Sequence, residues 1–441
     1  MHLNLEQVID GARLGPLHWR VLILCALVTL IDGYDIQAMA AATPDLAADW
    51  HVPPGQLRWI ITAALIGIAG SALFVSPLGD YFGRRTVLLG SFALVGVATL
   101  LAATAHTQPQ LFAWRFLTGI GLGASLPNAL ALTAEFAPTR NRTALVALMA
   151  CGISLGAALS GFAAPAVIGF GGWRAIFATA GVLAVLAWLP LFVLPESLRF
   201  MVARGHDPNE TGALLERLDA AHRHSQGDTY VMSERPAGKT SVGELLTPAL
   251  APATVLLWLV FFLNLGLLYL LSSWLPTLLH ESGLPHDTAQ RVAAMFQIGG
   301  VVGGFALAGL MQRWGPFIVL SVSYTLTAIA LAVLGARAPD VTLTTLLIVV
   351  MGNGVVGGQV ALNVLSATLY PTTARATGVG WALGMGRFGG ILAPLIAGQL
   401  MAAGIAIGRL FWLAIAPALI CAAGVALLRA AVARSQTVAL R

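Results

Sequence analysis

The sequence predicts an all-α membrane protein with twelve transmembrane helices. Of its 441 residues, 58% are hydrophobic and only 10% are charged, whereas a soluble domain carries about 25% charged residues. Crossing the hydrocarbon core takes about 20 apolar residues in a helix, because lipid offers no partner for unpaired backbone groups. The stretches that meet this requirement are 20–42, 57–78, 86–105, 110–135, 143–169, 173–194, 252–279, 289–311, 316–336, 341–369, 375–402 and 408–430.

The basic residues predict how these helices are oriented. With the N-terminus inside, most of the 24 Lys and Arg fall on the cytoplasmic side, which is the positive-inside bias. The first apolar run is interrupted by Asp32 and Asp35 and is not followed by a cleavage site, so we expect no cleaved signal peptide. We therefore expect a multi-pass protein of a bacterial-type inner membrane with both termini in the cytoplasm.

Two landmarks recur along the chain and indicate a duplication. The segment PTRNR at 138–142 follows the fourth span, and PTTAR at 371–375 follows the tenth. Gly83 after the second span recurs as Gly315 after the eighth, and the two spacings differ by one residue. Parallel repeats are a transporter architecture, with the substrate held near the middle of the membrane between them.

The duplication predicts two six-helix bundles, residues 1–194 and 251–441, joined by a cytoplasmic connecting loop at 195–250. We interpret this loop as a solvated tether rather than a regulatory domain. The leucines of Glu210–Arg223 have helical periodicity, which predicts one short surface helix within it.

Several motifs resemble those of a known transporter superfamily. GDYFGRR at 79–85 and RFLTGIG at 115–121 resemble signatures of the major facilitator superfamily. Narrower motifs resemble those of the aromatic acid:proton symporters, which include the 4-hydroxybenzoate/protocatechuate and benzoate permeases. These are DGYD at 32–35, GLGASLPN at 121–128, LSSWLPT at 271–277 and RATGVGWALGMGR at 375–387. The resemblance implies the major facilitator fold of two six-helix bundles.

Three acidic residues are candidates for proton coupling. Asp32 and Asp35 lie deep in the first span and share one face, and an ionised carboxylate there costs several kcal/mol, about 3 on insertion scales, unless it is paired or hydrated. The alternative is a salt bridge that only holds helices together. Glu135, at the cytoplasmic end of the fourth span, is implied by the resemblance to be needed for transport. Its geometry also allows a simple ion pair with Arg84, Arg140 or Arg142.

Two arginines inside spans are candidates for binding the substrate. Arg387 lies in the eleventh span among glycines, and its planar guanidinium matches a carboxylate in bidentate fashion. We expect it to hold the substrate carboxylate, or to pair with an aspartate until substrate arrives; the alternative is a fixed interhelical ion pair. The resemblance implies that Arg115 is also needed for transport and lies beside the aspartates of the first span.

Aromatic and amide side chains in the spans are candidates for contact with a substrate ring and its hydroxyl groups. Each aromatic side chain also has a packing or lipid-facing interpretation, and each amide can instead bridge two helices. The aromatic candidates are Tyr269, Trp274, Phe296 and Trp381, and the amides are Asn128, Gln297, Gln359 and Asn363.

The loop at 79–85 predicts a conformational latch. Asp80 can cap the helix that follows and pair with a basic side chain in one state only. The second copy has Gln312 in place of Asp80, so the two latches differ. The resemblance assigns Arg375 to a conformational gate, and the basic residues that complete the predicted latch are Arg84, Arg85 and Arg142.

Other classes of protein are excluded by what the sequence lacks. GNGVVG at 352–357 matches a dinucleotide fingerprint, but it lies inside a predicted helix with no preceding strand. There is no Walker sequence, no catalytic triad and no cluster of metal ligands. We therefore expect no enzyme, no metal and no cofactor, with protons as the coupling ion. The net charge of +5 follows the membrane orientation, so we expect no nucleic-acid partner, and we expect a monomer in the lipid bilayer.

These features together predict a secondary transporter that imports small aromatic carboxylates by proton symport with alternating access. The substrate type is 4-hydroxybenzoate, protocatechuate or benzoate. The alternatives are a symporter of another organic acid such as muconate, a drug/proton antiporter, and a membrane sensor of aromatic acids. The sensor is disfavoured by the absence of a signalling domain in the sequence.

Overall fold

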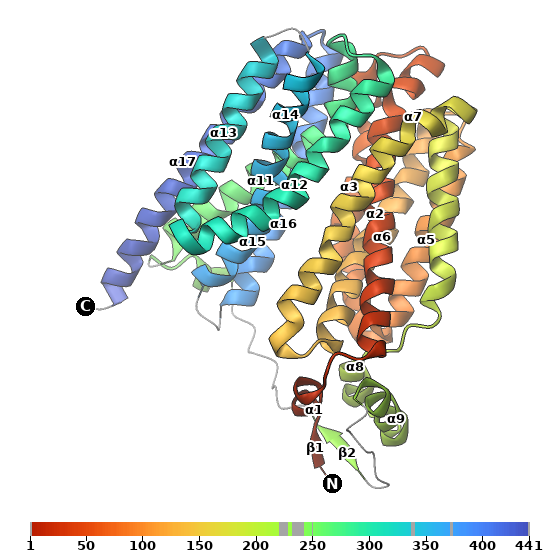
Figure 1. Cartoon of the computed structure of the whole chain (residues 1–441), viewed down its shortest axis with the longest axis vertical. Helices are drawn as coiled ribbons and strands as arrows, with labels where there is room; N and C mark the ends of the chain where they lie inside the picture. The colour runs from red at the N-terminus through yellow and green to blue at the C-terminus, as the bar shows by residue number, and fades with distance from the viewer. Residues whose placement is uncertain are drawn as a thin grey trace. The chain divides into compact units, whose positions relative to one another are not determined.

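The computed structural model describes residues 2–219, 228–231, 242–248, 250–336, 340–370 and 374–439. Within these residues, eleven helical segments are long and apolar enough to cross a membrane, and Figure 1 shows them as long helices. They comprise α2 (Pro16–Asp49), α3 (Arg58–Phe74), α5 (Arg84–Ala103), α6 (Gln108–Phe136), α7 (Thr139–Leu191), α11 (Ala251–Glu281), α12 (His286–Trp314), α13 (Pro316–Ala336), α14 (Val341–Gly352) with α15 (Gly358–Leu369), α16 (Arg375–Ala402) and α17 (Ile407–Ala439).

Helix α7 contains the fifth and sixth predicted spans. Its 53 residues would make a straight helix about 80 Å long at 1.5 Å per residue, far more than the roughly 30 Å of a hydrocarbon core. The chain turns at Gly171 and Gly172, where the backbone is not helical and Gly172 has φ 61°. Glycine adopts this positive φ without a steric penalty. The predicted twelve-helix fold is therefore confirmed.

The tenth predicted span is interrupted at its centre. Between α14 and α15, residues Asn353–Gly357 form a single turn of π-helix, labelled η3. This turn contains all but the first residue of the glycine-rich segment that matches a dinucleotide fingerprint, and the element directly before it is helix α14 rather than a strand. A π-turn inside an α-helix changes which carbonyl groups are bonded within the helix and is frequent at functional sites.

The chain forms two compact units. The first comprises residues 1–36, 63–156 and 174–237, and the second comprises 37–62, 157–173 and 238–441. Within the second unit, segments from early and late in the sequence meet: Gln290 Nε2 of α12 donates to the Ala41 carbonyl of α2 at 2.8 Å. The division of the chain into two six-helix bundles at 194 and 251 stays a prediction.

A small cap covers one end of the helices of the first unit (Figure 1). It consists of β1 (His2–Asn4), α1 (Leu5–Gly11), α8 (Leu198–Ala203), α9 (Pro208–Leu218) and β2 (Thr229–Val231), with β1 and β2 paired in parallel. The predicted surface helix is thus present as α9, and the last residues of its predicted range lie outside the described residues.

The described part of the connecting segment is more than a solvated tether. Leu215 and Leu218 of α9 are buried in one hydrophobic core with Leu5 and Ile9 of α1. Asp10 accepts hydrogen bonds from the backbone N–H and hydroxyl of Thr139, where α7 begins. These bonds hold the pKa of Asp10 below its ordinary value. The cap therefore attaches the N-terminus to the first turn of α7.

Helices α2 and α7 approach so closely that neither has room for a side chain at the crossing. A Cβ on Gly156 would lie 1.8 Å from the Leu30 carbonyl oxygen, and one on Gly33 would lie 1.9 Å from that of Ile153. Small residues at helix crossings are what bring helices together in a membrane.

We expect Gly156→Ala to lower the Tm of the purified protein, because two backbones would have to separate. Gly90→Ala is the matched control, since a Cβ there meets nothing within 4 Å and alanine favours helix by roughly 0.5–1 kcal/mol over glycine. The measurement is thermal unfolding in detergent. Equal Tm values for the two variants would show that the crossing at Gly156 is not closely packed.

Candidate functional site

A buried ion pair lies in the first unit between α2 and α6. Arg115 Nη1 donates to Asp35 Oδ2 at 2.8 Å, and both side chains are at most 2% exposed. Thr99 donates its hydroxyl to the other carboxylate oxygen, Oδ1, at 2.8 Å. The guanidinium of Arg115 also lies 5.4 Å from the ring centroid of Phe177. Both oxygens of Asp35 are therefore occupied, and Arg115 lies beside this aspartate as the sequence predicted.

Asp32 lies one turn earlier on α2 and lacks a cationic partner among the described residues. Its Oδ2 atom accepts a hydrogen bond from the Ser125 hydroxyl at 2.9 Å, and its Oδ1 atom is buried without a hydrogen-bond partner. The residue is 3% exposed. A buried polar atom without a partner costs free energy, and a buried unpaired charge costs much more. The two aspartates thus have different surroundings, although they share a helix face.

Arg387 of α16 belongs to the second unit and is half-buried. Within the described part of the chain it has no ion pair, and Tyr269 of α11 lies near it. Tyr269 packs against α16 so closely that a Cβ on Gly390 would lie 2.6 Å from its ring. The expected alternative of a fixed interhelical ion pair at Arg387 is therefore not formed by the described residues. Its predicted role in holding the substrate carboxylate stays a prediction.

The other aromatic candidates have packing contacts. Trp274 and Phe296 are at most 1% exposed, and the Trp274 indole N–H donates to the Pro394 carbonyl at 3.0 Å. Trp381 is 44% exposed and stacks on Trp258 with ring centroids 5.7 Å apart. Nothing in these contacts assigns a ligand to Trp274, so its predicted role in binding stays a prediction.

The four candidate amides divide into two kinds. Asn128 donates to the carbonyls of Ser76 and Ala124, and Gln297 donates to the Ser272 hydroxyl at 3.1 Å, so each bridges helices of its own unit. Gln359 donates to Asn363 on the same helix, α15, at 3.0 Å, and it also accepts from Asn264 of α11 at 2.8 Å. Asn363 is exposed and Gln359 is partly exposed. These two amides are accessible from outside the helix.

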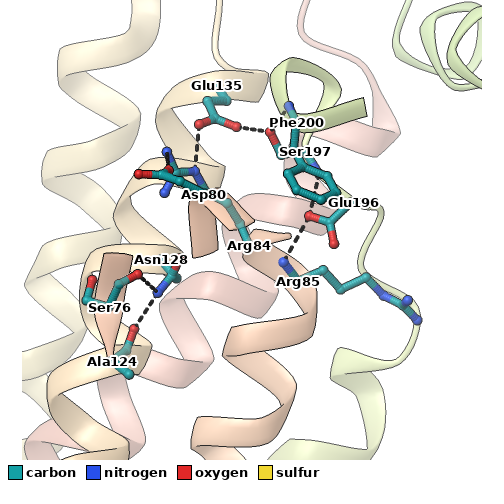
Figure 2. Close-up of polar contacts among 10 residues, drawn as sticks. All are labelled: Ser76, Asp80, Arg84, Arg85, Ala124, Asn128, Glu135, Glu196, Ser197 and Phe200. Carbon is teal, nitrogen blue, oxygen red and sulfur yellow. Dashed lines mark hydrogen bonds and ion pairs between the residues drawn. The ribbon is translucent and has the colours of Figure 1, made fainter. Parts of the chain in front are cut away.

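A charged cluster joins three parts of the first unit (Figure 2). Arg84 pairs with Asp80 at 2.9 Å and with Glu135 of α6 at 2.7 Å. Glu135 also accepts a hydrogen bond from the Ser197 hydroxyl. Ser197 in turn caps α8 by accepting from the Phe200 N–H at 3.1 Å. The cluster thus connects the loop before α5, the end of α6 and the start of α8.

The expectation that Asp80 caps the next helix is wrong. Asp80 lies in the short helix α4 (Gly79–Phe82), and α5 has no side-chain cap at Gly83. Glu196 takes this place, because its Oε1 atom accepts from the Arg85 N–H at 3.0 Å, as Figure 2 shows. The positive φ of Gly83, 95°, turns the chain so that Asp80 faces Arg84 instead.

Two of the remaining gating candidates, Arg85 and Arg142, donate to backbone carbonyls. Arg85 donates to the Phe192 carbonyl at 2.8 Å. Arg142 donates to the Ala137 carbonyl at 3.3 Å and lies 4.0 Å from Asp10. Arg375 begins α16, but its side chain lies outside the described residues. The structure therefore brings Asp80, Arg84 and Glu135 together, whereas Arg85 and Arg142 make other contacts.

Sequence reasoning missed the neutral residues that complete these contacts. Thr99 and Ser125 bind the two aspartates, and Ser197 binds Glu135. Asn264 of α11 binds Gln359 of α15, and Tyr324 binds Asn264. Asn264 is an amide in an apolar span, which is the signal that selected the other amides and would have selected it too.

Comparisons with known proteins agree on one family and one fold. The chain matches the Major Facilitator Superfamily over residues 25–316 and 257–439. It is 37% identical to the 4-hydroxybenzoate transporter PcaK of Pseudomonas aeruginosa, over 91% of this chain and 90% of that protein. It is 35% identical to a gallate transporter of Pseudomonas putida, over 94% and 93%. A D-xylose-proton symporter structure aligns with a TM-score of 0.72 at 17% identity, over 92% of this chain and 97% of that one, which shows a shared fold.

Proposed function

Because this chain belongs to the Major Facilitator Superfamily, we propose that it imports small aromatic carboxylates together with protons by alternating access. The family predicted from the motifs is confirmed. The chain is a multi-pass membrane transporter and not an enzyme, since its relatives over nearly their full length are named transporters. The finer proposal, proton symport of a hydroxylated benzoate, rests on the charges inside the spans and on the substrates that those relatives are named for.

The observation that carries the proposal is a pair of uncompensated charges. Among the described residues, Arg387 lacks an anionic partner and Asp32 lacks a cationic one. A carboxylate substrate bound by Arg387 would supply the missing anion, in a geometry that suits the guanidinium fork. A proton on Asp32 would remove the cost of its buried charge. Asp35 is already neutralised by Arg115, so we assign the proton to Asp32.

Proton symport also meets the energetic demand of importing an anion. A negative interior opposes the entry of one negative charge by about 2.3 kcal/mol per 100 mV. One proton per carboxylate makes the cycle electroneutral, and a second makes the membrane potential favourable.

We propose an inner-membrane location, cytoplasmic termini and a monomer. We also propose that the cluster of Asp80, Arg84 and Glu135 acts as a latch. Ion-pair networks of this kind are broken and remade in conformational switching.

The experiment that tests the substrate class is uptake by proteoliposomes containing the purified protein. The panel is benzoate, 4-hydroxybenzoate, protocatechuate, gallate and cis,cis-muconate, each offered alone and as a competitor. We expect aromatic carboxylates to be taken up and muconate to compete weakly. Muconate uptake equal to that of every aromatic acid would instead support a transporter of general organic acids.

A further inference from the structure

A chain of three hydrogen bonds runs through the second unit from a buried tyrosine to an exposed amide. The Tyr324 hydroxyl of α13 donates to Asn264 Oδ1 of α11 at 3.0 Å. Asn264 Nδ2 donates to Gln359 Oε1 of α15 at 2.8 Å, and Gln359 Nε2 donates to Asn363 Oδ1 at 3.0 Å. Tyr324 and Asn264 are 0% exposed, whereas Asn363 is exposed.

The direction of this chain is fixed at its buried end. Asn264 Nδ2 also donates to the Val355 carbonyl at 3.3 Å, in the π-turn of the tenth span. A carbonyl oxygen can only accept a hydrogen bond, so the amide of Asn264 presents its NH2 group to Val355 and Gln359, and its oxygen to Tyr324. Gln359 must then direct its own NH2 group toward Asn363. Each bond therefore points the same way, and such chains polarise their members cooperatively.

The outer end of the chain is a hydrogen-bond donor. The oxygen of Asn363 is taken by Gln359, and within the described residues its Nδ2 atom has no partner. Asn363 lies on the exposed face of α15 with Val360 and Val364. Both valines line a cavity of about 320 Å³, together with residues of α12. Ligand pockets begin at about 300 Å³, so a small molecule has room against Val360 and Val364, although Asn363 itself does not line this cavity.

We propose that Tyr324 and Asn264 are positioning residues that make Asn363 a donor for an oxygen substituent on the aromatic ring of the substrate. This inference rests on the proposed function and extends it. It predicts that the transporter prefers benzoates with a ring hydroxyl over benzoate itself. The π-turn has a defined part in this arrangement, because its Val355 carbonyl sets the orientation of Asn264.

The test is the ratio of kcat/KM for 4-hydroxybenzoate to that for benzoate, measured by proteoliposome uptake. In Tyr324→Phe, the buried oxygen of Asn264 loses its donor, and we expect the ratio to fall about 3- to 10-fold, the size of one hydrogen bond, through KM for 4-hydroxybenzoate. Benzoate kinetics should stay near those of the wild type. Asn363→Ala, at the exposed end of the chain, should lower the ratio similarly without burying or exposing a core group.

Thr327→Val is the matched control, because Thr327 is 0% exposed on the same helix as Tyr324 and donates its hydroxyl to its own helix at the Ser323 carbonyl. It should leave the ratio unchanged. An unchanged ratio in both Tyr324→Phe and Asn363→Ala, or an equal loss for the two substrates, would overturn the inference. If the wild-type protein takes up neither acid, the proposed function itself is overturned. Failure of the proposed function can therefore be distinguished from failure of this inference alone.

Discussion

Asp32→Asn is expected to abolish accumulation of substrate against a gradient while leaving counterflow exchange in place. Asparagine imitates the protonated acid, and it can still accept the hydrogen bond from Ser125. The variant should therefore bind substrate and exchange it, since exchange requires no release of the proton. It should not concentrate substrate, because the proton can no longer be unloaded. Gradient-driven uptake and counterflow are measured side by side on the same proteoliposomes.

Asp35→Asn is the informative comparison, because it lies on the same helix and carries the same change. It removes the anion that pairs with Arg115, and both partners are at most 2% exposed. Breaking a buried ion pair on one side costs about 3–5 kcal/mol, so we expect a lower Tm and the loss of both assays. If Asp32→Asn accumulates substrate like the wild type, Asp32 does not carry the proton, and Glu135 becomes the candidate.

Arg387→Lys is expected to raise KM for aromatic carboxylates about 10- to 100-fold, with a larger loss in Arg387→Ala. Lysine keeps the charge but loses the planar fork that binds a carboxylate at two points, and a hydrogen bond to a charged group contributes about 1.5–3 kcal/mol. Because Arg387 has no ion pair within the described residues, the Tm should change little. The measurement is uptake kinetics together with thermal unfolding.

Arg115→Lys provides the control for this prediction. The same substitution at Arg115 disturbs a buried pair with Asp35, so it should lower the Tm. If Arg387→Lys and Arg387→Ala both keep the wild-type KM, the carboxylate binds elsewhere and Arg115 is the next candidate.

The sequence was sufficient to predict the membrane-spanning helices and to select the charged residues inside them. Both predictions depend only on the apolar lipid that surrounds the helices. Apolar length alone identified spans such as 375–402, which the structure has as α16 with the same bounds. A charge inside a span is costly wherever it lies, and for that reason Asp32, Asp35, Arg115 and Arg387 could be selected without knowing their neighbours.

The partners of these charges could not be predicted, because they come from distant parts of the chain. Asp32 and Ser125 lie on different helices. Ser125 is part of the GLGASLPN motif, but the motif does not show which group the serine binds. The cap of α5 was assigned to Asp80 because it is near in sequence. Glu196 reaches the same N-terminus from beyond α7, which only the packing of the helices could reveal. The π-turn within the tenth span was hidden for the same reason.

The central claim is that the downhill movement of protons drives the uptake of an aromatic carboxylate. The most direct measurement is uptake of labelled 4-hydroxybenzoate into proteoliposomes that are alkaline inside, in buffers free of sodium and ATP. The account predicts accumulation above the outside concentration while the proton gradient lasts, and its loss on addition of a protonophore. Uptake that is unchanged by the protonophore, and that appears only with sodium or ATP, would contradict the account.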